Sequence, residues 1–119
     1  MEIRRIGIIG MGQMGRGIAE VCAISGYEVI ATDSNLDTLN DSKTQIITDL
    51  KKLEKKNKLQ SGRIDSVLSH IILVNDLSKF KSCDLIIEAA TEKEQIKKKI
   101  FLDLKPYIKD STILATNTS

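Results

Sequence analysis

The chain has 119 residues, enough for one domain with a sheet covered by helices. Apolar residues make up 41% of it and aromatic residues 3%, with no Trp, so the core must be built from aliphatic side chains, as in α/β proteins. The 18 basic and 16 acidic residues leave a net charge of +2, which gives no electrostatic case for binding nucleic acid.

The sequence carries no membrane, export or metal-binding signal. No apolar stretch approaches the length that spans a bilayer, so we expect no membrane partner. Residues 1–5 lead directly into the first expected strand rather than into a targeting segment. Cys22 and Cys83 match no disulfide or metal-ligand spacing, which predicts reduced thiols and no metal site. We therefore expect a cytoplasmic protein, although a processed organellar protein would have the same composition.

The first predicted unit is a strand, a glycine-rich turn and a helix. The isoleucines of segment 3–9 predict a buried parallel strand that leads into the turn. The turn is Gly10-Met11-Gly12-Gln13-Met14-Gly15, which has the G-x-G-x-x-G pattern of dinucleotide-binding proteins. Apolar residues at helical spacing then predict one buried helix face: Met14, Ile18, Val21 and Cys22.

Each glycine of this turn has a predicted role in holding a dinucleotide. Gly10 permits the tight turn, Gly12 removes the side chain where main chain approaches a pyrophosphate, and Gly15 lets the helix pack close to the strand. The first N–H groups of the helix, with their partial positive charge, then face the phosphates. The alternative is a turn whose glycines serve only steric needs.

Asp33 follows the second apolar run and lies 23 positions after Gly10. At the end of a strand beside the turn, its carboxylate is placed to accept hydrogen bonds from the hydroxyls of an adenosine ribose. It also repels a 2′-phosphate, and neither Ser34 nor Asn35 supplies a cation for one, so NAD is favoured over NADP. The alternative is an acid that flanks the next helix, but Ser34 is better placed to cap that helix.

Two helices are predicted between the second and third strands, where an ordinary crossover needs one. Apolar residues at helical spacing mark a long helix, and Ser34 and Asp37 have capping-box spacing at its start. The helix runs into the lysine-rich segment 51–58, whose simplest interpretation is a solvated face. After a break at 61–62, a shorter helix covers about 63–69, so the pair forms an inserted helical hairpin.

The rest of the chain continues the alternation of strands and helices. Strands are predicted at 71–74, 85–87 and 113–115. Thr91 and Glu94 have capping-box spacing and open a helix that ends near Pro106. This alternation predicts an α/β fold formed by one domain over residues 1–119: a Rossmann-type, doubly wound parallel sheet in the strand order 3-2-1-4-5.

Ligands of such a sheet bind beyond the carboxyl ends of its strands. The residues predicted at that edge are Gly10, Asp33, Glu88 and the segment 117–119. Glu88 is as consistent with holding a loop as with contacting a ligand. His70, the one histidine, precedes the third strand at its amino end, so we interpret it as structural rather than as a general base.

Six segments of the chain form a set with a wider resemblance. They are residues 8–19 around the glycine turn, 26–29, Asp33 with its lysine-rich helix, Asp84-Leu85-Ile86-Ile87-Glu88-Ala89, the helix 97–104, and Ile113-Leu114-Ala115-Thr116-Asn117-Thr118-Ser119. This set resembles the 3-hydroxyacyl-CoA dehydrogenase family, in particular its bacterial 3-hydroxybutyryl-CoA dehydrogenases. The likeness covers essentially all 119 residues and corresponds to the family's amino-terminal, NAD-binding part. Many dehydrogenases share the glycine pattern, whereas the I-E-A and A-T-N-T-S segments discriminate more.

The resemblance implies an oxidoreductase that passes hydride between the 3-hydroxyl of an acyl-CoA and NAD. It implies cofactor contacts from Glu92, Lys97 and Asn117, in addition to the glycine turn with Gln13 and Met14. Alternatives remain for two of these residues, because Glu92 also suits the positive end of its helix and Lys97 also suits a solvated surface.

Substrate contacts are implied at two places. Ser119 matches the serine that orients the substrate oxygen, and Lys56 matches a contact to the CoA nucleotide. Where the family often has a serine earlier on the same helix, this chain has Asp49.

The family's catalytic His–Glu pair lies beyond the A-T-N-T-S segment, and a helical carboxy-terminal domain forms its dimer. Residues 1–119 contain neither, so we expect this chain to bind NAD(H) without turning over substrate, and the full-length protein to be a homo-oligomer. The alternatives are a β-hydroxyacid dehydrogenase, whose opening pattern is nearly the same, and a nucleotide-sensing domain without catalysis.

Overall fold

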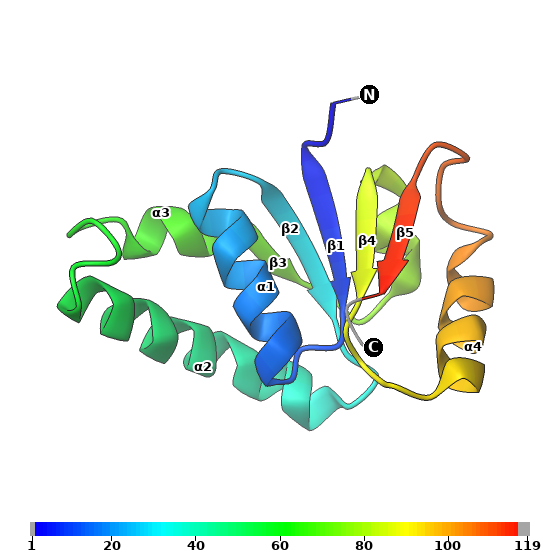
Figure 1. Ribbon diagram of the computed structural model, residues 1–119, viewed down its shortest axis with the longest axis horizontal. Coiled ribbons are helices and arrows are strands. Elements are labelled where there is room, and N and C mark those ends of the chain that lie inside the picture. Colours follow the sequence, from blue (N-terminus) through cyan, green and yellow to red (C-terminus); the bar gives the residue numbers. More distant parts are fainter. Residues whose placement is uncertain (1, 117–119) are drawn as a thin grey trace.

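A computed structural model describes residues 2–116 and shows a five-stranded parallel sheet in the order β3-β2-β1-β4-β5 (Figure 1). The strands are β1 (Arg5–Ile9), β2 (Glu28–Thr32), β3 (Ile71–Leu73), β4 (Leu85–Glu88) and β5 (Ile113–Thr116). The helices are α1 (Gln13–Ile24), α2 (Leu36–Lys55), α3 (Ile64–Ser69) and α4 (Glu94–Leu104), with a short 3₁₀ helix, η1 (Leu77–Ser82). The predicted strand order and the inserted hairpin of α2 and α3 are confirmed.

Both faces of the sheet are buried, because successive side chains of a strand point to opposite faces. Ile8 of β1 packs in the core beneath α1, α2 and α3, whereas its neighbour Ile9 packs in a second core with Phe80 of η1 and Leu104 of α4. Figure 1 accordingly shows α1 to α3 on one side of the sheet and α4 on the other. The sheet is therefore doubly wound, and the carboxyl ends of all its strands meet at one edge.

The predicted apolar face of α1 is only partly buried. Ile18 and Cys22 pack against the core as partly buried side chains. Met14 and Val21 are 53% and 65% exposed, so their predicted burial is wrong. The positions that face the sheet include Gly15, Ala19 and Ala23. At Gly15 the physical reason is the close approach of the helix to the turn, because an added Cβ would lie 1.6 Å from the carbonyl oxygen of Gly10.

Both predicted capping boxes are wrong. The N-cap of α2 is Asn35, whose side chain accepts the N–H of Thr38 at 3.0 Å, and not Ser34. Asn35 is placed there because its own N–H donates to Asp33 at 2.8 Å. Before α4, the hydroxyl of Thr91 accepts the N–H of Lys93 in a local turn, so the helix begins two residues later than a cap at Thr91 would require.

The short helix η1 has no counterpart in the predicted elements. Asp76 starts it by accepting the N–H of Ser78 at 2.9 Å, and it carries the fully buried Phe80. A Cβ added at Gly7 would lie 2.6 Å from the Phe80 ring, so the glycine in β1 makes room for this aromatic side chain. Within residues 2–116, no helix is both long enough and apolar enough to cross a membrane.

Candidate functional site: the glycine turn and the carboxyl edge of the sheet

The three glycines of the turn meet three different surroundings. Gly10 has a φ of 105°, and a Cβ on it would lie 2.7 Å from the main chain of Ala90. A Cβ on Gly15 would lie 1.6 Å from the carbonyl oxygen of Gly10. A Cβ on Gly12 would meet no heavy atom of residues 2–116 within 4 Å. Gly10 and Gly15 thus have the predicted structural roles, while Gly12 borders open space.

That open space lies at the amino end of α1. Gly12 is the N-cap of the helix, and within the described part of the chain no side chain caps it and no acidic residue occupies the first turn. The first N–H groups of an α-helix have no intrahelical acceptor and carry a partial positive charge. Gln13 and Met14, two of the predicted contacts, are exposed there. This end of α1 can accept an anionic group from solution.

Asp33 ties the glycine turn to the start of α2. One carboxylate oxygen accepts the N–H of Met11 at 2.8 Å and the other accepts the N–H of Asn35 at 2.8 Å. Asp33 therefore does flank α2, as the alternative interpretation has it, through its bond to the N-cap residue Asn35. A carboxylate oxygen accepts two hydrogen bonds, so each retains capacity for a ligand hydroxyl.

A cavity of about 500 Å³ adjoins this carboxylate at the carboxyl edge of the sheet. Its apolar lining includes residues of three elements, β1, η1 and α4: Ile9, Leu77, Ile96 and Ile100. Asp33, Asn75 and Thr91 contribute polar groups to the same lining. The volume lies in the range of small-molecule sites, and the mixture of apolar walls with a few polar groups is typical of them.

Most of this lining was absent from the predicted site. Asn75 lies just past the end of β3, so its place at the carboxyl edge follows from the strand order, and that signal was available in the sequence. Ile96 and Ile100 lie one turn apart on α4, and the sequence analysis named neither as a site residue. Which helix face reaches the cavity depends on the packing of α4.

Glu88 holds the loop that faces the glycine turn. It is fully buried, and one carboxylate oxygen accepts the N–H groups of Ala90 at 2.6 Å and Thr91 at 2.9 Å. The other oxygen accepts the hydroxyl of Thr116 on β5 at 2.9 Å. These bonds favour the loop-holding interpretation of Glu88. They fix Ala90 at the position where it packs against Gly10.

The residues predicted by family resemblance fall at different places. Lys97 of α4 is only 6% exposed, so the alternative of a solvated surface lysine is wrong. Glu92 is exposed in the loop before α4. Lys56 is exposed at the far end of α2, away from the turn (Figure 1). Asn117 and Ser119 lie outside the described residues.

His70 lies at the amino edge of the sheet, as expected. It ends α3, and its Nδ1 is 2.9 Å from the carbonyl oxygen of Ser66.

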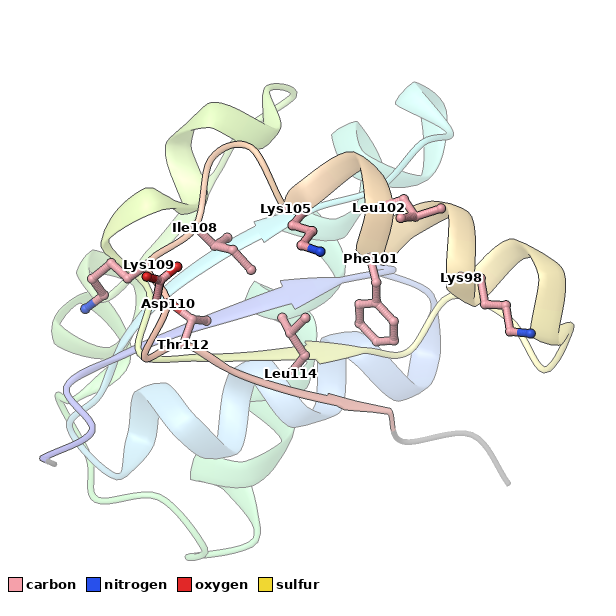
Figure 2. Close-up of a pocket in the computed structure, with 9 residues that line it drawn as sticks. All are labelled: Lys98, Phe101, Leu102, Lys105, Ile108, Lys109, Asp110, Thr112 and Leu114. Atoms are coloured by element: carbon pink, nitrogen blue, oxygen red, sulfur yellow. The ribbon is translucent and has the colours of Figure 1, made fainter.

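A second cavity, of about 580 Å³, lies between α4 and β5, where Figure 2 shows Phe101 and Leu114 facing a common space. No residue of the glycine turn lines it.

Comparison with known proteins assigns the chain to a family. The family described as "3-hydroxyacyl-CoA dehydrogenase, NAD binding domain" matches residues 5–119. A probable 3-hydroxybutyryl-CoA dehydrogenase of Deinococcus radiodurans is 43% identical over 97% of this chain and 41% of its own length. A 3-hydroxybutyryl-CoA dehydrogenase of Bradyrhizobium diazoefficiens is 38% identical over 98% of this chain and 40% of its own.

Solved structures agree with this assignment. The (S)-3-hydroxybutyryl-CoA dehydrogenase of Ralstonia eutropha superimposes with a TM-score of 0.92 at 35% identity, over 99% of this chain and 42% of that one. The chain therefore spans about 40% of the length of the curated relatives named above. It belongs to the 3-hydroxyacyl-CoA dehydrogenase family, as the family's NAD-binding domain.

Proposed function

We propose that the glycine turn, Asp33 and the adjoining cavity form the NAD site of this domain. The diphosphate fits the open amino end of α1 because Gly12 leaves main-chain N–H groups uncovered. The adenosine ribose fits Asp33, which has acceptor capacity beside the turn. The adenine fits the mainly apolar cavity next to that carboxylate. The open space at Gly12 is the observation that carries this proposal.

For the whole protein we propose oxidation of a 3-hydroxyacyl-CoA, with 3-hydroxybutyryl-CoA as the substrate that the relatives' names favour. Bound NAD supplies the hydride acceptor. By family resemblance, Asn117, Glu92 and Lys97 contact the cofactor, Ser119 orients the substrate oxygen, and Lys56 contacts the CoA nucleotide. A cytoplasmic location and a dimer are further parts of this proposal and rest on the same resemblance and on composition.

The matched pair Gly12→Ala and Gly17→Ala tests the NAD site. Each added methyl group meets no heavy atom of residues 2–116 within 4 Å, so neither disturbs packing. Only the methyl at position 12 projects where the diphosphate is proposed to bind. Titration of NADH by its fluorescence is expected to show at least tenfold weaker binding to Gly12→Ala and unchanged binding to Gly17→Ala. Equal affinities would place the diphosphate elsewhere.

Asp33→Ala tests the ribose contact. We expect it to weaken NADH binding by about 1–2 kcal/mol, the scale of hydrogen bonds to a charged group. Unchanged affinity would mean that the ribose does not bind there. Since Asp33 also holds Met11 and Asn35, a urea unfolding curve of the variant must accompany the titration.

The 119-residue chain is expected to bind NADH without oxidising 3-hydroxybutyryl-CoA. Within residues 2–116 no histidine lies at the carboxyl edge of the sheet, so the described site has no imidazole base to take the hydroxyl proton. Reduction of NAD⁺ by the purified chain and substrate, followed at 340 nm, would contradict this expectation. A preference for NADPH over NADH would contradict the assigned role of the Asp33 carboxylate.

A further inference from the structure

Three charged side chains meet between α1 and α2, and none of them belongs to the proposed NAD site. Arg16 and Glu20 lie one turn apart on α1, and Asp49 lies on α2. Arg16 Nε donates to Asp49 Oδ2 at 2.8 Å and lies 3.9 Å from Glu20 Oε2. Glu20 is only 7% exposed, so this carboxyl group has been removed from water.

An ionised Glu20 would have a buried carboxylate oxygen without a hydrogen-bond donor in residues 2–116. Its Oε2 is buried and, among the described residues, no donor is assigned to it. The carboxylate of Asp49 lies beside it, because both carboxyl groups approach the same Arg16 Nε and a side-chain hydrogen bond relates them. Two ionised carboxylates only accept hydrogen bonds, so they cannot bond to each other. A proton on one of them turns that group into a donor, so the two carboxyl groups can then form a hydrogen bond.

We propose that Glu20 carries this proton at neutral pH and donates it to Asp49, so that a carboxylic acid–carboxylate hydrogen bond joins α1 to α2. Glu20 is the member that keeps the proton because it is the more buried of the two. Asp49 keeps its negative charge because the Arg16 guanidinium bonds to it directly. The cluster of Arg16, Glu20 and Asp49 is then neutral overall.

The acid–base properties of the two groups agree with this assignment. Burial raises the pKa of Glu20 to about 8, helped by the hydrogen bond and charge of Asp49 and opposed by the charge of Arg16. Burial acts to raise the pKa of Asp49 too, but the hydrogen bonds from Glu20 and Arg16, with the charges of Arg16 and Lys52, lower it overall. Mildly alkaline solution would therefore remove the shared proton and leave two carboxylates facing one guanidinium.

The sign of the pH effect follows from proton linkage. Between the ordinary glutamate value of 4.5 and about 8, the unfolded chain releases the Glu20 proton while the folded chain retains it. The equilibrium constant for folding therefore falls by up to about tenfold per pH unit across this window, and it becomes constant above the window. Glu20→Gln supplies the matched control, because its amide can donate to Asp49 and has no proton to lose.

Two measurements on the 119-residue chain test the proposal without reference to any ligand. The first follows the side-chain carboxyl carbons of ¹³C-labelled glutamate by NMR, with the Glu20 signal assigned by its loss in Glu20→Gln. We expect that signal to titrate near pH 8, and to move to lower pH in Asp49→Asn. Titration of Glu20 at its ordinary value would overturn the proposal, because it would mean an ionised Glu20 paired with Arg16.

The second measurement compares urea unfolding of the natural chain and Glu20→Gln from pH 5 to 9. The ratio of their unfolding constants is expected to change by about 100-fold or more between pH 5 and pH 8, with the variant the more stable at the alkaline end. Parallel curves would overturn the proposal. If Glu20→Gln does not fold, sequential NMR assignment of the natural chain still identifies the Glu20 signal, so the first measurement decides.

Discussion

The closeness of α1 to the glycine turn predicts that Gly15→Ala strongly destabilises the domain. The added Cβ would lie 1.6 Å from the carbonyl oxygen and 2.8 Å from the carbonyl carbon of Gly10. Both are main-chain atoms of the glycine turn. A hydrogen bond from the Gly10 N–H to the carbonyl oxygen of Thr32, at 2.8 Å, holds this turn in place. The turn cannot yield without breaking that bond, so α1 must move off the sheet.

The cost of that movement can be estimated from the residues it affects. Overpacking a well-packed core costs about 1–3 kcal/mol, and more where the contact is main chain that cannot relax. Ala19 and Ala23 lie on the same face of α1 and are buried, so they would lose contacts as well. Alanine in place of glycine within a helix recovers about 1 kcal/mol. We expect a net loss of about 3 kcal/mol in the free energy of unfolding.

Gly17→Ala is the control for this prediction, because Gly17 lies in the same helix and an added Cβ there meets no heavy atom of residues 2–116 within 4 Å. It should raise stability by about 0.5–1 kcal/mol. Urea unfolding at pH 7, followed by far-ultraviolet circular dichroism, would measure both changes. Opposite shifts of the two midpoints are expected. If Gly15→Ala unfolds at the same midpoint as Gly17→Ala, the close approach of α1 to Gly10 is refuted.

Two further predictions concern buried and edge carboxylates. Glu88→Ala leaves the N–H groups of Ala90 and Thr91 without their acceptor, and should cost about 3–5 kcal/mol in thermal unfolding. Glu88→Gln retains an amide oxygen for these groups, so equal losses in both variants would refute the loop-holding role. The Lys109 ammonium and the N–H groups of Arg4 and Arg5 hold the pKa of Asp84 well below its usual range. Its stabilising contribution is thus present at neutral pH and lost in acid below about pH 4. The melting temperature of Asp84→Asn should be lower than that of the natural chain at pH 7 and converge with it in acid, and a constant difference would contradict this assignment.

Local patterns in the sequence determined the order of the elements, the strand order and the glycine turn. Such features depend on short-range rules: apolar periodicity, the conformational freedom of Gly10, and the right-handed connection between parallel strands. Asp33 could be placed at the carboxyl edge for the same reason, since a residue that follows a parallel strand must lie there.

Only the tertiary structure decided which side chains those elements bury and which polar groups they pair. Sequence spacing predicted Met14 and Val21 on the buried face of α1, but both are exposed. Gly15 is buried instead, because a Cβ there would collide with the main chain of Gly10. Likewise, nothing local marks Glu20 on α1 and Asp49 on α2 as neighbours, because 29 positions separate them along the chain. Their contact and the proton inferred between them exist because the packing of two helices removes one carboxyl group from water beside another.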